Sequence, residues 1–473
     1  MKKILIITII IFGFVFNNRA QNYYPNYNCY TIAAGKNATE NKNVLVAHNE
    51  DDWGDLIVNI FKVPAKDYTE NEQITLLNGT KINQVKHTLA YLWFETTKQK
   101  FGDYYLNEFG VSICSDACGS KEDTAIGNIG FYLRRIIAER AKSAKQGVKI
   151  AGKIISQIGY ESSGRTYCIA DSKEIWMLSV VKGKHWIAER VPNDMVAIIP
   201  NYYTIENVNL QDTNNFLGSS DIIDYAEKRG WYNPQKDKNF SFKKAYSATQ
   251  NLYSIGNIPR HWSGINYLSE KEFNYGDNLP FAFKPKKNIT KNDLQKILSS
   301  HYENTDFETN YKIHKNPHKN VINRICNAGT KFSIVTEFHN DRPADNAYIV
   351  WWAPLNPCIN PYIPIAYGIK EIPKEYQSCK LTDALKRHFD NNKNTFEANP
   401  EHAYNVFNRY NTFVNNDYEK HIILAKKQKE NIEKKAQYMY NIENVKKDSQ
   451  VGRASTEMLK ILLRKEKDVF RLF

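Results

Sequence analysis

Residues 28–35, Asn-Cys-Tyr-Thr-Ile-Ala-Ala-Gly, form a short β-rich run in which Cys29 is the second residue. A turn region follows, and a second β-rich run, Asn-Val-Leu-Val-Ala-His-Asn-Glu-Asp at residues 43–51, ends in polar and acidic side chains. Two such runs around a turn predict a pair of antiparallel strands. This pairing would bring Cys29 close to Asp51, and we expect the chemistry of the protein at that end of the hairpin.

The first 20 residues have the pattern of a secretory signal. Residues 1–3 are Met-Lys-Lys, and residues 4–16 are an apolar run that is too short to span a bilayer comfortably. We therefore interpret residues 1–20 as a signal peptide and residues 21–28 as a short propeptide or linker. Asn18 and Arg19 fit a signal cleavage site poorly, which leaves an uncleaved anchor open as the alternative. The expected location is periplasmic or extracellular.

The charge of the chain is strongly basic, +13 at pH 7. In a cytosolic protein such a charge would suggest nucleic-acid binding. Here the basic residues are scattered along an exported chain, so we expect a solvated basic surface and no nucleic-acid partner. The hydrophobic fraction of 42% supports a sizeable core in a chain of 473 residues.

Seven cysteines in an exported chain leave at least one unpaired. Cys29 is the candidate for the reactive thiol, and Cys114 and Cys118 are close enough in sequence for a small loop disulfide. No second cysteine or histidine pair stands at zinc spacing, and there is no His-Glu-x-x-His sequence. We therefore expect no metal and no cofactor.

Strand-like and helix-like blocks alternate along the chain. Apolar residues recur at helical spacing within residues 127–158, with Ser143 as a candidate cap, and a less regular, loop-rich stretch at residues 211–278 reads as an insertion bordering the active site. This alternation predicts sheets covered by helices in a layered α/β or α+β domain. Strands are expected at residues 56–63, 88–94, 167–180, 185–190, 195–199, 332–337 and 348–352, and further helices from residue 290 and at residues 417–446.

Several motifs together carry a resemblance to a known family. The sequence resembles the PepD-type dipeptidases, cysteine peptidases of the N-terminal-nucleophile hydrolase superfamily. This resemblance implies an α+β fold, a four-layer αββα sandwich with added helices and loops, and one dipeptidase catalytic domain at residues 29–473 that includes a helical C-terminal region. The motifs are Cys29-Tyr30-Thr31, Ala47-His48-Asn49-Glu50-Asp51, Asn107-Glu108-x-Gly110, His185-Trp186-x-x-Glu189-Arg190, Asn201-x-x-x-Ile205, His301-Tyr302-Glu303 and Arg324-x-Cys326-Asn327.

An N-terminal cysteine could supply both the nucleophile and the base for hydrolysis of a peptide bond. Its thiol is the nucleophile, and its α-amine, with a reference pKa of about 7.7 to 8, is a base near neutral pH. If residues up to 28 are removed, Cys29 gains such an amine. The thiolate would attack a peptide carbonyl, form a thioester and be released by water, so small peptides are the expected substrates.

The resemblance also implies roles for two residues of the second run. Asp51 would hold and polarise the α-ammonium of Cys29. Its plainer interpretation is that of a carboxylate in a turn. Asp52 is a possible alternative to Asp51 in this role. Related acylases place Arg-x-x-Asp here, whereas this sequence has His48-x-x-Asp51. His48 either retains part of the positive role of that arginine or is a buried hydrogen-bonded histidine.

Three later residues match further positions of the same site. Asn107 and Asn201 match asparagines that serve the oxyanion or the α-amine, although Asn107 also reads as an ordinary turn residue. One amide donor at an oxyanion lowers a barrier by about 3 to 4 kcal/mol. Arg324 is a candidate for the late arginine of the site, with a structural salt bridge as the alternative.

Two other functions remain open on sequence alone. An amidase of the bile-salt hydrolase or penicillin V acylase type would share almost the same catalytic residues, and a surface-binding protein would need no catalysis at all. No stable membrane partner is expected, and the sequence leaves a homo-oligomer open.

Overall fold

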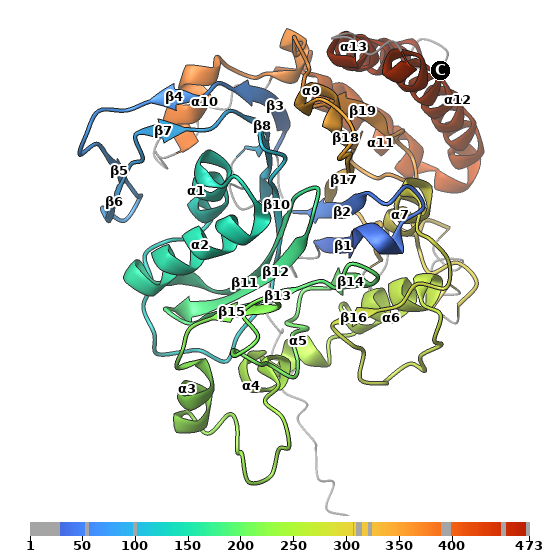
Figure 1. Ribbon diagram of the computed structural model, residues 1–473. Coiled ribbons are helices and arrows are strands. Elements are labelled where there is room, and N and C mark those ends of the chain that lie inside the picture. The colour runs from blue at the N-terminus through green and yellow to red at the C-terminus, as the bar shows by residue number, and fades with distance from the viewer. Residues whose placement is uncertain are drawn as a thin grey trace, which may run out of the picture.

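Two large β-sheets dominate the structure, which is a computed structural model (Figure 1). The expected signal at residues 1–20 and linker at residues 21–28 lie outside the residues described. These described residues are 29–52, 56–97, 102–305, 307–308, 315–319, 324–388, 399–445 and 451–469.

The seven-stranded sheet has the predicted hairpin at its centre. Strands β1 (Tyr30–Ala34) and β2 (Val44–Asp51) pair antiparallel, with Thr31 opposite His48. The hairpin prediction is confirmed. The strand order is β16-β14-β1-β2-β17-β18-β19, and the other strands are β14 (Val196–Ile199), β16 (Ala282–Phe283), β17 (Thr330–Phe338), β18 (Tyr348–Pro354) and β19 (Ile363–Ala366).

The eight-stranded sheet is built from the middle of the chain, in the order β15-β13-β12-β11-β10-β9-β8-β3. Its strands are β3 (Val58–Val63), β8 (Tyr91–Thr96), β9 (Tyr104–Asn107), β10 (Ser112–Ala117), β11 (Tyr160–Ala170), β12 (Ile175–Gly183), β13 (Trp186–Arg190) and β15 (Phe216–Gly218). Two small two-stranded sheets join β4 (Lys66–Asp67) to β7 (His87–Thr88) and β5 (Gln73–Thr75) to β6 (Lys81–Asn83).

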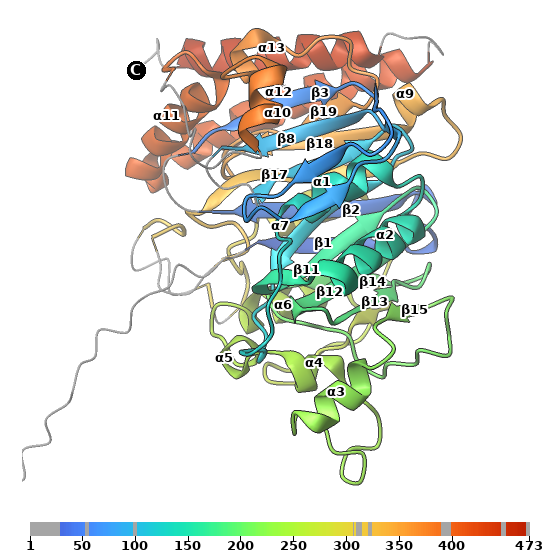
Figure 2. The ribbon, with the colours of Figure 1, turned by 90° about the vertical axis from the view of Figure 1, so that its left-hand side faces the viewer.

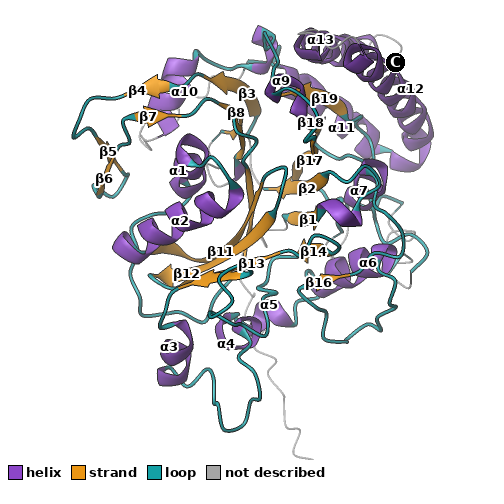
Figure 3. Ribbon diagram, in the orientation of Figure 1, coloured by secondary structure: helices purple, strands orange, loops and turns teal. Residues whose placement is uncertain are grey.

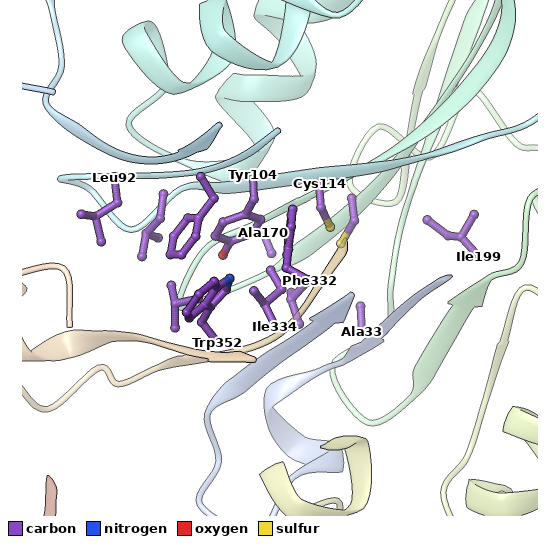
Figure 4. Packing of buried hydrophobic residues seen from close by; sticks show 14 of the residues in the cluster. Ala33, Leu92, Tyr104, Cys114, Ala170, Ile199, Phe332, Ile334 and Trp352 are labelled. Atoms are coloured by element: carbon purple, nitrogen blue, oxygen red, sulfur yellow. The ribbon is translucent and has the colours of Figure 1, made fainter. Parts of the chain in front are cut away.

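The largest apolar core lies between the two sheets (Figure 4). Side chains alternate across each strand, so Ala33, Ile334 and Trp352 of one sheet meet Leu92 and other residues of the second sheet. One polar contact also crosses this core, a hydrogen bond of 2.7 Å between the hydroxyls of Tyr104 and Thr336. By the same alternation, the side chains of residues 29, 31, 48 and 50 point toward the second sheet.

Helices cover the outer face of each sheet (Figure 3). Helices α1 (Tyr132–Arg140) and α2 (Ala144–Ile158) pack on the eight-stranded sheet, and the hydroxyl of Ser143 caps α2 by accepting a hydrogen bond from the Gln146 amide. Helices α6 (Ile258–Leu268) and α7 (Lys291–Leu298) pack on the seven-stranded sheet. The predicted helical pattern and its Ser143 cap are confirmed.

The segment 211–278 is more helical than the sequence suggested. It contains α3 (Ile222–Lys228), α4 (Phe242–Tyr246), α5 (Thr249–Leu252) and α6. Three of these helices have seven residues or fewer, too few to show a clear apolar period.

Long helices at the C-terminal end form a further layer beside β19 (Figure 2). No helix in the described part of the chain is both long enough and apolar enough to cross a membrane. The helices that follow β17 along the chain are α9 (Ala344–Ala347), α10 (Leu381–His388), α11 (Ala403–Asn416), α12 (Tyr418–Val445) and α13 (Val451–Val469). Short 3-10 turns lie at Lys36–Ala38 and Lys374–Tyr376.

The expected disulfide between Cys114 and Cys118 is wrong. Cys114 lies within β10 and Cys118 directly follows it, so the two Cα atoms are separated by about 13 Å of extended chain. A disulfide needs Cα atoms within about 7 Å. All seven cysteines are free thiols in the structure.

Candidate active site

Cys29 lies directly before β1, buried at the end of the central hairpin. Its thiol donates a hydrogen bond of 3.1 Å to Oε1 of Glu50, and its Sγ lies 3.8 Å from the backbone carbonyl oxygen of Asp51. The predicted proximity of Cys29 and Asp51 is confirmed. Glu50, which the sequence did not single out, is the residue that the thiol contacts through its side chain.

A chain of buried polar groups continues from Glu50 across to the second sheet. Oε2 of Glu50 lies 3.0 Å from Nε2 of His48, and Nδ1 of His48 lies 2.8 Å from the hydroxyl oxygen of Thr31. The Thr31 hydroxyl donates its only proton to the carboxylate of Asp116 on β10. Nδ1 of His48 must therefore donate to Thr31, while Nε2 donates to Glu50. Both ring nitrogens carry protons, so His48 is an imidazolium in this arrangement.

The pKa of His48 agrees with this proton count. Burial by itself would lower the pKa, but the neighbouring Cys114, Glu50 and Asp116 raise it well above its usual value. This supports the first of the two sequence interpretations, in which His48 retains the positive charge that an arginine has in the related acylases. Burial raises the pKa of Asp116 to about 6, so its carboxylate is ionised above that pH.

The thiol of Cys29 is protonated in this environment. Burial and the charge of Glu50 raise its pKa well above the usual value. A thiolate is the reactive form of a cysteine, so a base must take the proton during catalysis. A carboxylate already accepts the thiol proton as a hydrogen bond, and the α-amine of a processed Cys29 would lie on the same residue.

Asp51 is buried, and its backbone carbonyl oxygen lies 3.8 Å from the sulfur of Cys29. Its Oδ2 accepts a hydrogen bond of 2.5 Å from the side-chain amide of Asn327, whereas Oδ1 is buried without a donor of standard geometry among the described residues. Burial raises the pKa of Asp51 to about 7, against hydrogen bonds from Thr330 and Asn327 and the charge of Arg260. Oδ1 is therefore open to a further donor of better geometry.

Asp52, the alternative to Asp51, is buried as well. Burial and the charge of Glu50 raise its pKa well above the usual value, and neither of its carboxylate oxygens has a hydrogen-bond donor of standard geometry among the described residues. No hydrogen bond described in the structure links the Asp52 side chain to Cys29, whereas the Asp51 backbone contacts its sulfur.

Arg260 of α6 ties Cys29 to Asn201. Its guanidinium donates to the carbonyl oxygen of Cys29 at 3.1 Å, to Oδ1 of Asn201 at 2.7 Å and to Oδ1 of Asn257 at 2.9 Å. Asn201 follows β14 with a φ of 68°, in the left-handed region that asparagine tolerates better than most residues. Its Nδ2 donates to the carbonyl of Ala117 at 3.0 Å. The structure therefore brings Asn201 to the site.

Two sequence assignments do not fit these contacts. The Asn107 amide donates to the carbonyls of Ala138 and Ala141 at the end of α1 and accepts from the amides of Phe109 and Val111. Its four hydrogen bonds are thus used in closing a turn, which supports the plainer interpretation of this residue. An oxyanion role for Asn107 finds no support in these contacts.

Arg324 is the second of these, because no hydrogen bond among the described residues links its side chain to Cys29. Its guanidinium lies over the ring of Tyr302 at 4.9 Å, and its backbone carbonyl accepts a hydrogen bond from Asn327. The arginine that contacts the backbone of Cys29 is Arg260. No sequence motif marks Arg260, because it lies in α6, far from the hairpin along the chain, and reaches Cys29 only in the folded protein.

A buried thiol directly before a strand, with carboxylates, an imidazolium and an arginine around it, has the chemical groups of a candidate hydrolase site. Residues 28–430 match the family described as "Peptidase family C69". This chain belongs to that family and is a peptide-bond hydrolase. The resemblance identified from the motifs is confirmed.

Individual relatives are distant but cover most of the chain. A probable dipeptidase B of Lactococcus lactis is 24% identical over 369 residues, which are 74% of this chain and 77% of that protein. The dipeptidase of Bifidobacterium longum is 23% identical over 385 residues, 73% of this chain and 72% of that protein. A mutant conjugated bile acid hydrolase from Clostridium perfringens covers 72% of this chain and 92% of its own at 10% identity, with a TM-score of 0.25.

The role of Arg260 can be tested by Arg260→Lys. A lysine is a point charge that cannot reproduce the forked contacts to Cys29, Asn201 and Asn257. We expect kcat/KM for a peptide substrate to fall by about 10- to 100-fold, which corresponds to about 1.4 to 2.8 kcal/mol.

The matched control is Arg229→Lys, because Arg229 makes a comparable set of bonds to Glu122 and Asp123 near α3. Thermal unfolding of both variants separates stability from activity. If Arg260→Lys lost no more activity than Arg229→Lys at equal Tm, Arg260 would be a structural residue only.

Proposed function

We propose that this protein is a cysteine dipeptidase whose nucleophile is the thiol of Cys29, freed at its N-terminus by removal of the preceding residues. The observation that carries the proposal is the position of Cys29, which presents its thiol to Glu50 and its backbone to Arg260. Relatives named as dipeptidases support the choice of substrate. The two sheets with a shared core and helices on their outer faces support a four-layer αββα sandwich of the N-terminal-nucleophile type.

In the proposed reaction, the neutral α-amine of Cys29 takes the proton of its own thiol. The thiolate attacks the carbonyl carbon of the dipeptide, and the electron pair of the carbonyl moves onto oxygen. When the tetrahedral adduct collapses, the α-ammonium returns the proton to the leaving amine and a thioester remains on Sγ. Water, deprotonated by the same amine, then hydrolyses the thioester and restores the thiol.

Neighbouring side chains have distinct tasks in this scheme. Asp51 offers Oδ1 to the new α-ammonium, which supplies a further donor to this buried oxygen. His48 offsets the negative charge of Glu50 and Asp116 beside the thiol. Asn201 is held by Arg260 and retains a second N–H on Nδ2 beyond the one given to Ala117, so it is our candidate for the oxyanion donor.

Removal of residues 1–28 needs a different base, because the nitrogen of Cys29 is then part of a peptide bond. Glu50 is suited to this step, since it already accepts the thiol proton at 3.1 Å. The thiolate would attack the carbonyl of residue 28, the nitrogen of Cys29 would leave as an amine, and water would cleave the resulting thioester. Together with the basic and apolar leader, this is our proposal for an exported, self-processed enzyme.

The N-terminus of the active protein tests the processing step. We expect mass spectrometry of the intact active enzyme to show a chain that begins at Cys29. Cys29→Ala should abolish activity, because the nucleophile is lost, and should leave the linker attached if cleavage is autocatalytic. An active preparation whose chains all begin upstream of Cys29 would rule out the α-amine as the base.

The pH profile tests the pairing of Asp51 with the amine. A carboxylate stabilises the ammonium and raises its pKa, so loss of the carboxylate lowers that pKa. Activity requires the neutral amine and rises with pH through its ionisation. We therefore expect Asp51→Asn to shift the acidic limb of kcat to lower pH and to reduce the maximal rate, because the amine is less well oriented.

Asp52→Asn is the matched control for this measurement, since Asp52 is equally buried and adjacent. It should leave the acidic limb in place. If Asp52→Asn moved the limb and Asp51→Asn did not, Asp52 would be the partner of the amine.

A substrate panel separates the dipeptidase from its alternatives. We expect hydrolysis of dipeptides with kcat/KM at least about 100-fold above that for glycine and taurine conjugates of bile acids or for penicillin V, a difference of roughly 2.7 kcal/mol in transition-state binding. Cys29→Ala prepared in parallel is the blank. The reverse preference would make the protein an amidase, and no turnover of any substrate by a chain that begins at Cys29 would favour a surface-binding protein.

A further inference from the structure

Four buried side chains outside the active site converge on one point. They are His301, His318, Cys326 and Cys358, here called the Cys2His2 cluster, and one nitrogen or sulfur atom of each lies within 4.8 Å of all the others. All four side chains are buried. They come from four separate segments: the end of the α7 region, residues 315–319, the loop before β17 and the loop after β18.

The distances within the cluster match those of a tetrahedral metal site. Zinc binds sulfur at about 2.3 Å and nitrogen at about 2.0 to 2.1 Å, so tetrahedral angles place two sulfurs about 3.8 Å apart, sulfur and nitrogen about 3.6 Å apart and two nitrogens about 3.3 Å apart. In the structure, the two Sγ atoms are 3.5 Å apart and the two Nε2 atoms 3.2 Å apart. Nε2 of His318 lies 3.6 Å from Cys326 Sγ and 3.4 Å from Cys358 Sγ.

When both imidazoles are neutral, their Nδ1 contacts leave a lone pair on each facing Nε2. Nδ1 of His318 lies 2.5 Å from Oδ1 of Asn415, and that amide is oriented because its Nδ2 donates to the carbonyl of Asn411. Nδ1 of His301 lies 3.2 Å from the carboxylate of Glu303. Both partners accept, so each Nδ1 is the protonated nitrogen.

Two neutral imidazoles of this tautomer would direct lone pairs at each other across 3.2 Å. A cation between them removes the repulsion, and two sulfurs at tetrahedral spacing make a metal ion the fitting cation. Histidine ligands of metals characteristically donate their second N–H to a carboxylate or amide oxygen. Glu303 and Asn415 stand where such partners are needed.

The sulfur side of the cluster has a hydrogen-bonding partner too. Nδ2 of Asn356 lies 3.7 Å from Sγ of Cys326, in a position to stabilise a thiolate. The ring of Tyr418 covers both imidazoles edge-on, with centroid separations of 6.4 Å to His301 and 5.6 Å to His318. The four side chains are buried, and together they would fill every position of a tetrahedral site.

We propose that the Cys2His2 cluster binds one zinc ion, held by Nε2 of His301 and His318 and Sγ of Cys326 and Cys358. Tetrahedral sites of two sulfurs and two nitrogens favour zinc among the common divalent metals. Four protein ligands make the site structural and leave no open position for catalysis. The metal would join the loop before β17 and the loop after β18 to residues 315–319 and to the end of the α7 region.

The proposed zinc site would also fix the position of the Asn327 side chain in the active site. Cys326 immediately precedes Asn327, whose side chain donates to Asp51. Asn356 bonds to both, since its Nδ2 contacts Cys326 Sγ and donates to the carbonyl of Asn327 at 2.6 Å. The zinc proposal itself does not depend on the proposed peptidase mechanism.

No metal was expected from the sequence, because these four ligands do not stand in the closely spaced pairs that mark zinc sites. Each ligand is separated from the next along the chain. The separation is 17 residues from His301 to His318, 8 residues from His318 to Cys326 and 32 residues from Cys326 to Cys358. Such spacing has no sequence signature, and only the folded chain brings the four together.

Metal analysis of the full-length protein, purified without chelators, tests the proposal. We expect about one equivalent of zinc per chain by inductively coupled plasma mass spectrometry. Cys326→Ser and Cys358→Ser should each lose most of it, whereas Cys379→Ser, which changes a half-buried cysteine elsewhere, should retain it. Zinc retained in both cluster variants would overturn the assignment, because the metal would then be bound at another site.

Two measurements on the wild-type chain do not depend on the folding of a variant. A mercurial that blocks thiols should release zinc to an indicator dye, and the protein reconstituted with Co2+ should show the intense visible bands of a tetrahedral thiolate complex. Metal-free protein with a Cys326–Cys358 disulfide in its peptide map would overturn the proposal. One equivalent of iron in place of zinc would overturn the choice of metal.

Discussion

The register of β1 against β2 is the constraint on which the active site depends. Thr31 faces His48, and two positions further toward the open end of the hairpin, on the same face, Cys29 lies beside Glu50. Because side chains alternate along a strand, a shift of one residue would turn all four side chains away from the second sheet. The apolar residues Ala33 and Val46 of the same strands lie in the intersheet core, so the burial that stabilises the fold also fixes the catalytic register.

Buried charge is the second feature of this site. The charges of Glu50, Asp51, Asp52 and Asp116 all act on the thiol of Cys29, and all four side chains are buried. Isolated buried carboxylates are costly, so each must be paired, hydrogen-bonded or protonated. His48 pairs with Glu50, whereas burial leaves Asp51 with a raised pKa and with one oxygen that accepts no hydrogen bond of standard geometry from the described residues. The α-ammonium of a processed Cys29 would offset the charge of Asp51 and donate a hydrogen bond to it. Because processing creates this α-amine, our proposal links processing to catalysis.

The site and the Cys2His2 cluster are connected through one short loop. Asn327 reaches Asp51, while its neighbour Cys326 belongs to the cluster. Between them, Asn356 bonds to both residues. A fixed loop position matters here, because a displacement of Asn327 would remove the hydrogen bond that Asp51 accepts in a buried environment, where an unpaired carboxylate oxygen is costly.

The sequence by itself determined the local parts of this protein: the hairpin of residues 30–51, the helices of residues 132–158 with their Ser143 cap, and Cys29 and Asp51 as neighbours. These follow from alternation, helical period and capping, which act over a few residues. Only the tertiary structure decided that Arg260 rather than Arg324 contacts Cys29, that Asn107 closes a turn, and that four single ligands meet in one cluster. Contacts between residues far apart in sequence depend on how the sheets and helices pack, and the periodic pattern of apolar residues in the sequence does not predict that packing.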